Sequence, residues 1–172
     1  MVFTASLDTT AKVITAGSCL LFIVIAYWNS RSLMRAKGDI INIIVRLFIF
    51  AVLISALAFS YMYSTKGYET RGKGLIITTH NEIRKFNYLQ IMDVRKVAAG
   101  EMAGLSRTFG VGGLFGYSGH FHNSTIGDMT FYATQQKNWV LMHTFAGEAI
   151  VVTPDNPDKF VYEVTAIITP NN

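Results

Sequence analysis

Two histidines, His120 and His122, stand two residues apart in a segment that reads as a strand. Side chains at this spacing point to the same face of a strand, so both imidazoles could bind one metal ion. His143 or Asp128 could supply a third ligand. The single cysteine, Cys19, lies in an apolar run and reads as a helix-packing residue, so no thiolate is available to complete a zinc site. The two histidines are therefore a candidate site only, and we expect no resident metal and no cofactor.

The other reactive residue types show no catalytic pattern. The chain contains no Ser-His-Asp order, nucleophile elbow or pair of carboxylates at a meaningful spacing. His143 shares a strand face with Trp139, Leu141 and Phe145, which favours a partly buried histidine with a local hydrogen bond. We therefore expect no enzymatic activity.

A glycine-rich segment between residues 110 and 119 invites comparison with a phosphate-binding loop. Its GVGGLF run lacks the third glycine of GxGxxG, and no GK[ST] follows, so the motif fails. Phe115, Tyr117 and Phe121 alternate with these glycines. This pattern indicates a bent strand in which glycine permits close backbone approach and the aromatic rings cover the gaps.

Four basic residues are candidate contacts for lipid headgroups or a protein partner: Arg71, Lys73, Arg84 and Lys85. Near an anionic membrane surface each could contribute about 1 kcal/mol. From residue 66 onward, however, ten basic residues face nine acidic ones, a net charge of +1. This near-neutral balance argues against nucleic acid as a partner.

The elements that must position these residues begin with a membrane segment. The chain is 51% hydrophobic and only 15% charged, whereas soluble domains carry about 25% charged residues. The run from Val13 to Trp28 has no charge and, with residues 9–12, reaches the roughly 20 residues that cross a bilayer. A second run, Ile40 to Tyr63, is interrupted only by Asn42 and Arg46, and arginine can snorkel to the interface. A cleaved signal peptide is disfavoured, because Asp8 precedes the first run.

We predict a transmembrane hairpin over residues 1–63, with helices over about 11–28 and 41–63, a connector over 64–73 and a soluble domain over 74–172. The short loop between the helices places both termini on one side of the membrane. Because that loop holds Arg31, Arg35 and Lys37, the positive-inside rule favours a cytoplasmic loop. The expected location is the inner cell membrane, multi-pass, with the C-terminal domain extracytoplasmic.

The soluble segment changes to a period of two, which is typical of strands. Residues 75–78 and 83–86 indicate a hairpin, and residues 91–97 a third strand. Three more runs, over residues 128–134, 138–145 and 148–153, predict an antiparallel meander because short connections separate them. Asn156 and Pro157 mark the start of a closing helix.

Three stretches resemble the bacterial pleckstrin-homology-like (PH-like) domains found behind transmembrane hairpins: FGVGGLFGYSGHF, GDMTFYATQQKNWVLMHT and IVVTPDNPDKF. The resemblance covers about residues 70–169. It implies a mainly-β PH-like fold, with two orthogonal antiparallel sheets capped by a C-terminal helix. It also implies a binding or scaffolding module and not an enzyme. Relatives that read phosphoinositides use a basic loop between the first two strands, where this chain has HNE followed by Arg84 and Lys85.

The expected function is therefore that of a non-enzymatic, membrane-anchored scaffold that binds a protein partner or copies of itself. A sensor of lipid headgroups or small ligands is one alternative. Another is an accessory subunit of a larger membrane complex, because Asn42 and Arg46 could face a partner helix.

Overall fold

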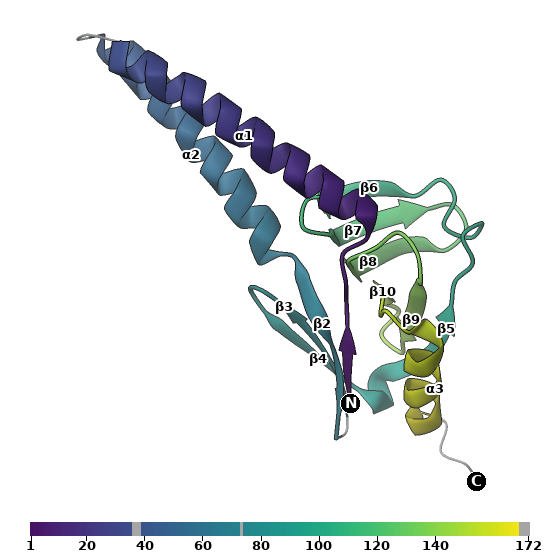
Figure 1. Cartoon of the computed structure of the whole chain (residues 1–172). Coiled ribbons are helices and arrows are strands. Elements are labelled where there is room, and N and C mark those ends of the chain that lie inside the picture. The colour runs from purple at the N-terminus through teal and green to yellow at the C-terminus, as the bar shows by residue number, and fades with distance from the viewer. Residues whose placement is uncertain (36–38, 73, 169–172) are drawn as a thin grey trace.

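Two long helices project from one end of a domain made of two sheets and a terminal helix (Figure 1). This computed structural model describes residues 1–35, 39–72 and 74–168. The arrangement confirms the predicted fold class, two apolar helices followed by a sheet-rich PH-like domain capped by a C-terminal helix.

The two helices are α1 (Thr9–Arg35) and α2 (Ile40–Met62), and they lie side by side (Figure 1). Both are long and apolar enough to cross a membrane. Only 6% of the apolar window of α1 and none of that of α2 is buried within the protein. Because a core helix buries its apolar face against other elements, this exposure on all sides is typical of helices that need lipid or a partner around them.

The first sheet contains four antiparallel strands in chain order: β1 (Val2–Thr4), β2 (Thr65–Arg71), β3 (Gly74–Thr79) and β4 (Ile83–Asn87). Residues 64–73 were expected to be a connector, but most of them form β2. The structure also adds β1 from residues that precede the helices, paired with β2 from Val2 opposite Glu69 to Thr4 opposite Gly67. The helical hairpin is thus inserted between two neighbouring strands of one sheet.

The second sheet has six strands, β5 (Ile91–Lys96), β6 (Ser106–Gly112), β7 (Tyr117–Asn123), β8 (Gly127–Ala133), β9 (Val140–Thr144) and β10 (Ala149–Val152), in the order β5-β9-β10-β8-β7-β6.

The predicted meander of the last three strands is wrong. β10 lies between β8 and β9 and runs parallel to β8. The backbone N–H of Thr134 donates to the Thr153 hydroxyl at 2.9 Å, and the Gln135 side chain donates to the Thr153 carbonyl at 3.2 Å. These bonds join the ends of β8 and β10, so residues 134–139 cross to β9 and do not form a tight turn.

The terminal helix α3 (Pro157–Ile168) closes one end of the space between the sheets, next to the 3₁₀ turn η1 (Tyr88–Gln90) (Figure 1). The predicted cap is confirmed, because the Asn156 side chain accepts a bond from the Lys159 N–H at 3.0 Å. Phe160 and Val164 are fully buried in the core between the sheets. A second core covers the other face of the six-stranded sheet, where Tyr117, Phe121 and Phe131 pack against Ala11 of α1.

Candidate ligand cleft beside the second helix

The base of α1 is fastened to the sheet domain by polar contacts. The Asp8 carboxylate caps the helix by accepting from the Ala11 N–H at 2.7 Å. Its second oxygen accepts from the Gln136 N–H, also at 2.7 Å. One turn into the helix, the Thr15 hydroxyl accepts from the Phe115 N–H at 2.9 Å. These bonds join the helix to the β6–β7 turn and to the segment after β8, which fixes its direction relative to the sheets.

The glycine-rich segment explains how the helix can approach so closely. Gly113 has a φ of 102°, and a Cβ there would lie 2.7 Å from Cδ1 of Ile14 on α1. Within the sheet, Gly110 and Gly119 are register partners, and a Cβ on either would overlap the backbone of the other strand. The expectation that these glycines permit close backbone approach is confirmed.

The end of α2 contacts the β3–β4 turn through aromatic rings and through hydrogen bonds between Ser64 and His80. The Ser64 hydroxyl lies 2.8 Å from Nδ1 of His80, and the ring centroids of Tyr61 and His80 are 4.1 Å apart. Phe59 of α2 makes an edge contact with Phe109 of β6 at 6.4 Å. The opening between β4 and β6 therefore lies next to the end of α2.

That opening is a cleft of about 280 Å³ between the edge of the first sheet and the face of the second. Tyr63 at the end of α2 forms part of its rim. The polar wall residues are Glu82 of the β3–β4 turn, Arg84 of β4, Ser118 and His120 of β7, and Thr130 and Tyr132 of β8. The size suits a small polar group such as a lipid headgroup.

The Ser118 hydroxyl is the most informative group in the cleft. Ser118 is 3% exposed, and within the described part of the chain its oxygen has no hydrogen-bond partner. A buried hydroxyl without a partner costs about 1–3 kcal/mol. A polar ligand atom that reached this hydroxyl would remove that cost, so Ser118 is a candidate ligand contact.

The remaining cleft groups supply both donors and acceptors. Arg84 donates to Glu82 at 2.6 Å, and both side chains are about half exposed. Burial raises the pKa of Tyr132, although the nearby Arg84 opposes the shift, so the Tyr132 hydroxyl stays protonated and can donate. Nδ1 of His120 lies 3.4 Å from the Thr130 hydroxyl. One cation, one carboxylate and several hydroxyls together can hold a polar group that carries both hydroxyl and anionic oxygens.

A family model described as a bacterial PH domain matches residues 66–167, from β2 to α3. The chain belongs to this family. Residues 1–65, which include α1 and α2, lie outside the match. PH domains are generally non-catalytic binding or scaffold modules. No curated protein and no solved structure matches the chain.

The PH domain brings together only part of the predicted basic set. Arg84 lines the cleft, whereas Lys85 lines a separate hollow with Phe145, because neighbouring residues on a strand point to opposite faces. Arg71 lies at the end of β2 remote from α2 and pairs with Glu69 at 3.0 Å. Lys73 lies outside the described residues. The three basic residues that the structure describes therefore do not form one patch beside the helices.

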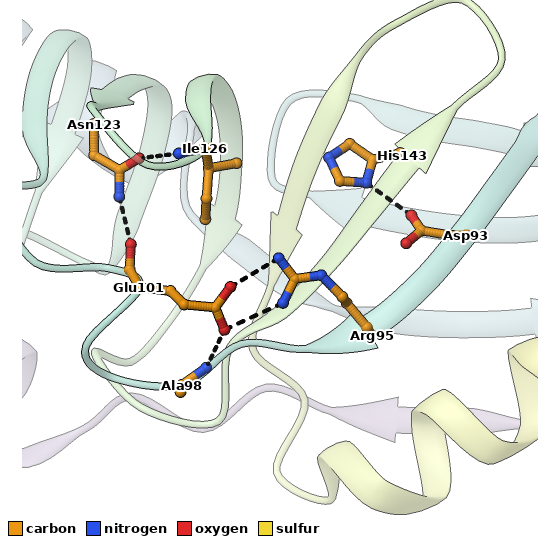
Figure 2. A network of polar contacts seen from close by, with 7 residues as sticks. All are labelled: Asp93, Arg95, Ala98, Glu101, Asn123, Ile126 and His143. Carbon is orange, nitrogen blue, oxygen red and sulfur yellow. Dashed lines mark hydrogen bonds and ion pairs between the residues drawn. The ribbon is translucent and has the colours of Figure 1, made fainter.

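Of the predicted metal ligands, His143 lies apart from the others. His122 contacts Asp128 at 2.8 Å, but His143 is on β9, with β10 and β8 between it and β7. Nδ1 of His143 instead lies 2.7 Å from Asp93, as expected for a partly buried histidine with a local hydrogen bond (Figure 2). Among the residues that the structure describes, no three metal-binding side chains gather. His143 is therefore not a third ligand.

A polar network fastens the loop after β5 over the second core of the PH domain (Figure 2). The Glu101 carboxylate accepts from Arg95 at 2.9 Å and from the Ala98 N–H at 3.1 Å. The Arg95 guanidinium, followed by the Ala98 N–H, lowers the pKa of Glu101. The Glu101 carbonyl accepts from Asn123 at 2.7 Å, and Asn123 in turn accepts from the Ile126 N–H. This network was not predicted from the sequence, because its two halves, residues 95–101 and 123–126, are separated in the chain and share no motif.

Proposed function

We propose that the chain is a non-enzymatic, membrane-anchored binding module that holds a polar headgroup or comparable small ligand in the cleft beside α2. The carrying observation is the buried Ser118 hydroxyl, which lacks a partner in the described residues and lines a cleft next to the end of α2. The hairpin of α1 and α2 anchors the module. The PH domain follows it, and β1, which precedes the hairpin, adds a strand to the first sheet of that domain.

Support for the anchor comes from the exposed apolar surface of both helices. The basic residues of the hairpin loop favour a cytoplasmic loop, so we place the PH domain outside the cytoplasm and the protein in the inner cell membrane. Because the hairpin continues into β1 and β2, two connections hold the domain next to the bilayer. The cleft then lies near the headgroups of the leaflet on the domain side.

The experiment uses the full chain in lipid nanodiscs with a phospholipid that carries a photoreactive diazirine on its headgroup. We expect cross-links to map to β4 and β7 at the cleft, and Ser118→Val or Arg84→Gln to lower their yield roughly tenfold, because a hydrogen bond to a charged group is lost. Ser106→Ala is the matched control: its hydroxyl is exposed on β6 and donates to the His122 carbonyl at 3.1 Å, outside the cleft. Cross-links confined to the helix ends, or yields unchanged by the cleft variants, would reject the proposal.

A second candidate function, a scaffold for a protein partner or for copies of the chain, has its own observation. Three large apolar side chains are exposed at the end of the domain away from the helices: Leu89 at 84%, Met92 at 54% and Phe145 at 71%. We call these three residues the distal surface. The Phe145 N–H donates to the Gln90 carbonyl at 2.9 Å, which brings two of its elements together. Exposed apolar groups of this kind mark interaction sites, and the neighbouring edge strand β4 could accept a partner strand.

A photo-cross-linking amino acid at position 145 tests the scaffold function in cells that express two differently tagged copies. The scaffold function predicts a specific cross-linked band, either to the second tag or to a distinct neighbour such as a subunit of a larger membrane complex. Position 162 on α3 is the control, since Tyr162 is 73% exposed but lies outside the distal surface. Equal labelling from both positions would count against the scaffold function.

A further inference from the structure

A groove of about 460 Å³ lies between α1 and α2, in the half of the hairpin near the loop that joins the two helices. Its polar wall is formed by Asn29 and Arg46, and its apolar wall by Val24, Ile25 and Ile49. The Asn29 side chain donates to the Arg46 carbonyl at 2.9 Å and accepts weakly from Nη1 of Arg46 at 3.4 Å. The first contact joins the two helices, and the second holds the guanidinium beside Asn29 in the groove.

The charge of Arg46 has no counter-ion in the described part of the chain, where it takes part in no ion pair. Its Nε is shielded from solvent and has no hydrogen-bond partner there. The acidic residue at the start of α2, Asp39, is already bonded to Asn42 through both of its oxygens. A guanidinium against apolar walls needs an anion, because burying an unpaired charge is costly.

The position of the groove indicates where that anion comes from. The apolar part of α1 ends at Trp28, which lines the groove and is 73% exposed. The neighbouring Tyr27 hydroxyl accepts from Arg31 at 3.2 Å. Tryptophan and tyrosine beside basic residues are typical of the boundary between hydrocarbon and headgroups. The groove therefore lies at the level of lipid phosphates.

We propose that Arg46 binds the phosphate of an anionic phospholipid in the leaflet opposite the PH domain. The terminal guanidinium N–H groups donate to phosphate oxygens, and an acyl chain lies along Val24, Ile25 and Ile49. An anionic lipid is favoured over a zwitterionic one because Arg31 and Arg35 add positive charge nearby. The inference rests on the proposed membrane span, although it concerns a different site from the cleft.

The test uses the full chain with Trp139→Phe, so that Trp28 is the one remaining tryptophan. The protein is reconstituted in phosphatidylcholine vesicles that contain brominated phosphatidylglycerol or, at the same mole fraction, brominated phosphatidylcholine. We expect roughly five-fold enrichment of the anionic lipid beside Trp28, seen as stronger quenching by brominated phosphatidylglycerol. Arg46→Gln should make the quenching by the two lipids equal. Arg46→Lys should leave an intermediate preference, because the ammonium keeps the charge but cannot form the bidentate hydrogen bonds of a guanidinium.

Arg31→Gln is the matched control, since it removes an equal charge at the same level, and it should keep most of the preference. Equal quenching in the parent protein, or a preference that survives Arg46→Gln, would overturn the inference. If quenching shows no lipid preference but falls as the protein-to-lipid ratio rises, a neighbouring helix covers the groove and the inference is also wrong. Absence of quenching by either lipid would instead contradict the membrane span itself.

Discussion

Single residues decide how closely α1 can approach the domain, and Gly113 is the clearest case. Its positive φ and the nearby Ile14 side chain both oppose a larger residue. Gly127 has a φ of 91°, but a Cβ there would meet nothing within 4 Å, so this position separates backbone strain from steric overlap. We expect Gly127→Ala to cost about 1–2 kcal/mol from the left-handed backbone alone. Gly113→Ala should cost about 1–3 kcal/mol more because it also overpacks the helix contact.

Thermal unfolding of both variants in detergent measures this difference. A Gly113→Ala protein no less stable than the Gly127→Ala protein would show that the helix contact is not close-packed.

Glu101 gives a residue-scale prediction about pH. Its pKa is lowered in the folded protein, chiefly by Arg95, from an ordinary value of 4.5. The folded state therefore binds a proton at Glu101 less readily than the unfolded state, so the carboxylate stabilises the fold above its unfolded pKa. That contribution is lost as the pH falls through the lowered folded value. Glu101→Gln should therefore destabilise the protein at neutral pH, and the difference should disappear in acid.

Unfolding temperatures of the parent and the Glu101→Gln variant, measured from neutral pH to below the ordinary glutamate pKa, check this. A difference that grows in acid would contradict the assigned role of Arg95.

Among the elements, α3 contributes most visibly to the core between the sheets. Phe160 is fully buried and makes edge contacts with Phe3 of β1 at 5.1 Å and with Tyr68 of β2 at 6.0 Å. Phe160→Ala should cost about 3–5 kcal/mol, because it removes a large buried ring and leaves a cavity. Tyr162→Ala on the exposed side of the same helix is the control. Chemical denaturation that finds equal losses for both would show that α3 does not close the core.

The positions of helices and strands along the chain could be predicted from the sequence better than the order in which the strands pair. The helices, most strands and the capped α3 follow from local periodicity and capping residues, which are properties of short segments. The position of β10 does not, because pairing with β8 depends on bonds from Thr134 and Gln135 to Thr153. Its uninterrupted AIVV run was nevertheless a usable signal, since a central strand with a parallel neighbour is buried on both faces.

The cleft shows the same limit for the site. Arg84 and His120 were each singled out from the sequence, but for different roles. They line one cleft only because β4 packs over β7 and β8. A local residue pattern does not indicate which faces of two sheets pack against each other. Ser118 carried no signal at all, because an ordinary serine in a strand becomes informative only when it is buried without a partner.

At the scale of the whole molecule, the hairpin and the domain form one unit. The hairpin is inserted between the paired strands β1 and β2. The start of α1 contacts the β6–β7 turn, and the end of α2 contacts the β3–β4 turn. We propose from this arrangement that the hairpin spans the bilayer. The cleft then lies near the headgroups, and the distal surface faces water.

Electron paramagnetic resonance of spin labels in vesicles tests that claim most directly. The native Cys19 labels the middle of α1, and Asn81→Cys or Leu89→Cys in a Cys19→Ala background labels the cleft rim or the distal surface. We predict that Cys19 collides with oxygen but not with a water-soluble nickel complex, that position 81 shows the intermediate accessibility of the headgroup zone, and that position 89 is open to nickel. Free access of nickel to Cys19, or equal access at positions 81 and 89, would contradict the account.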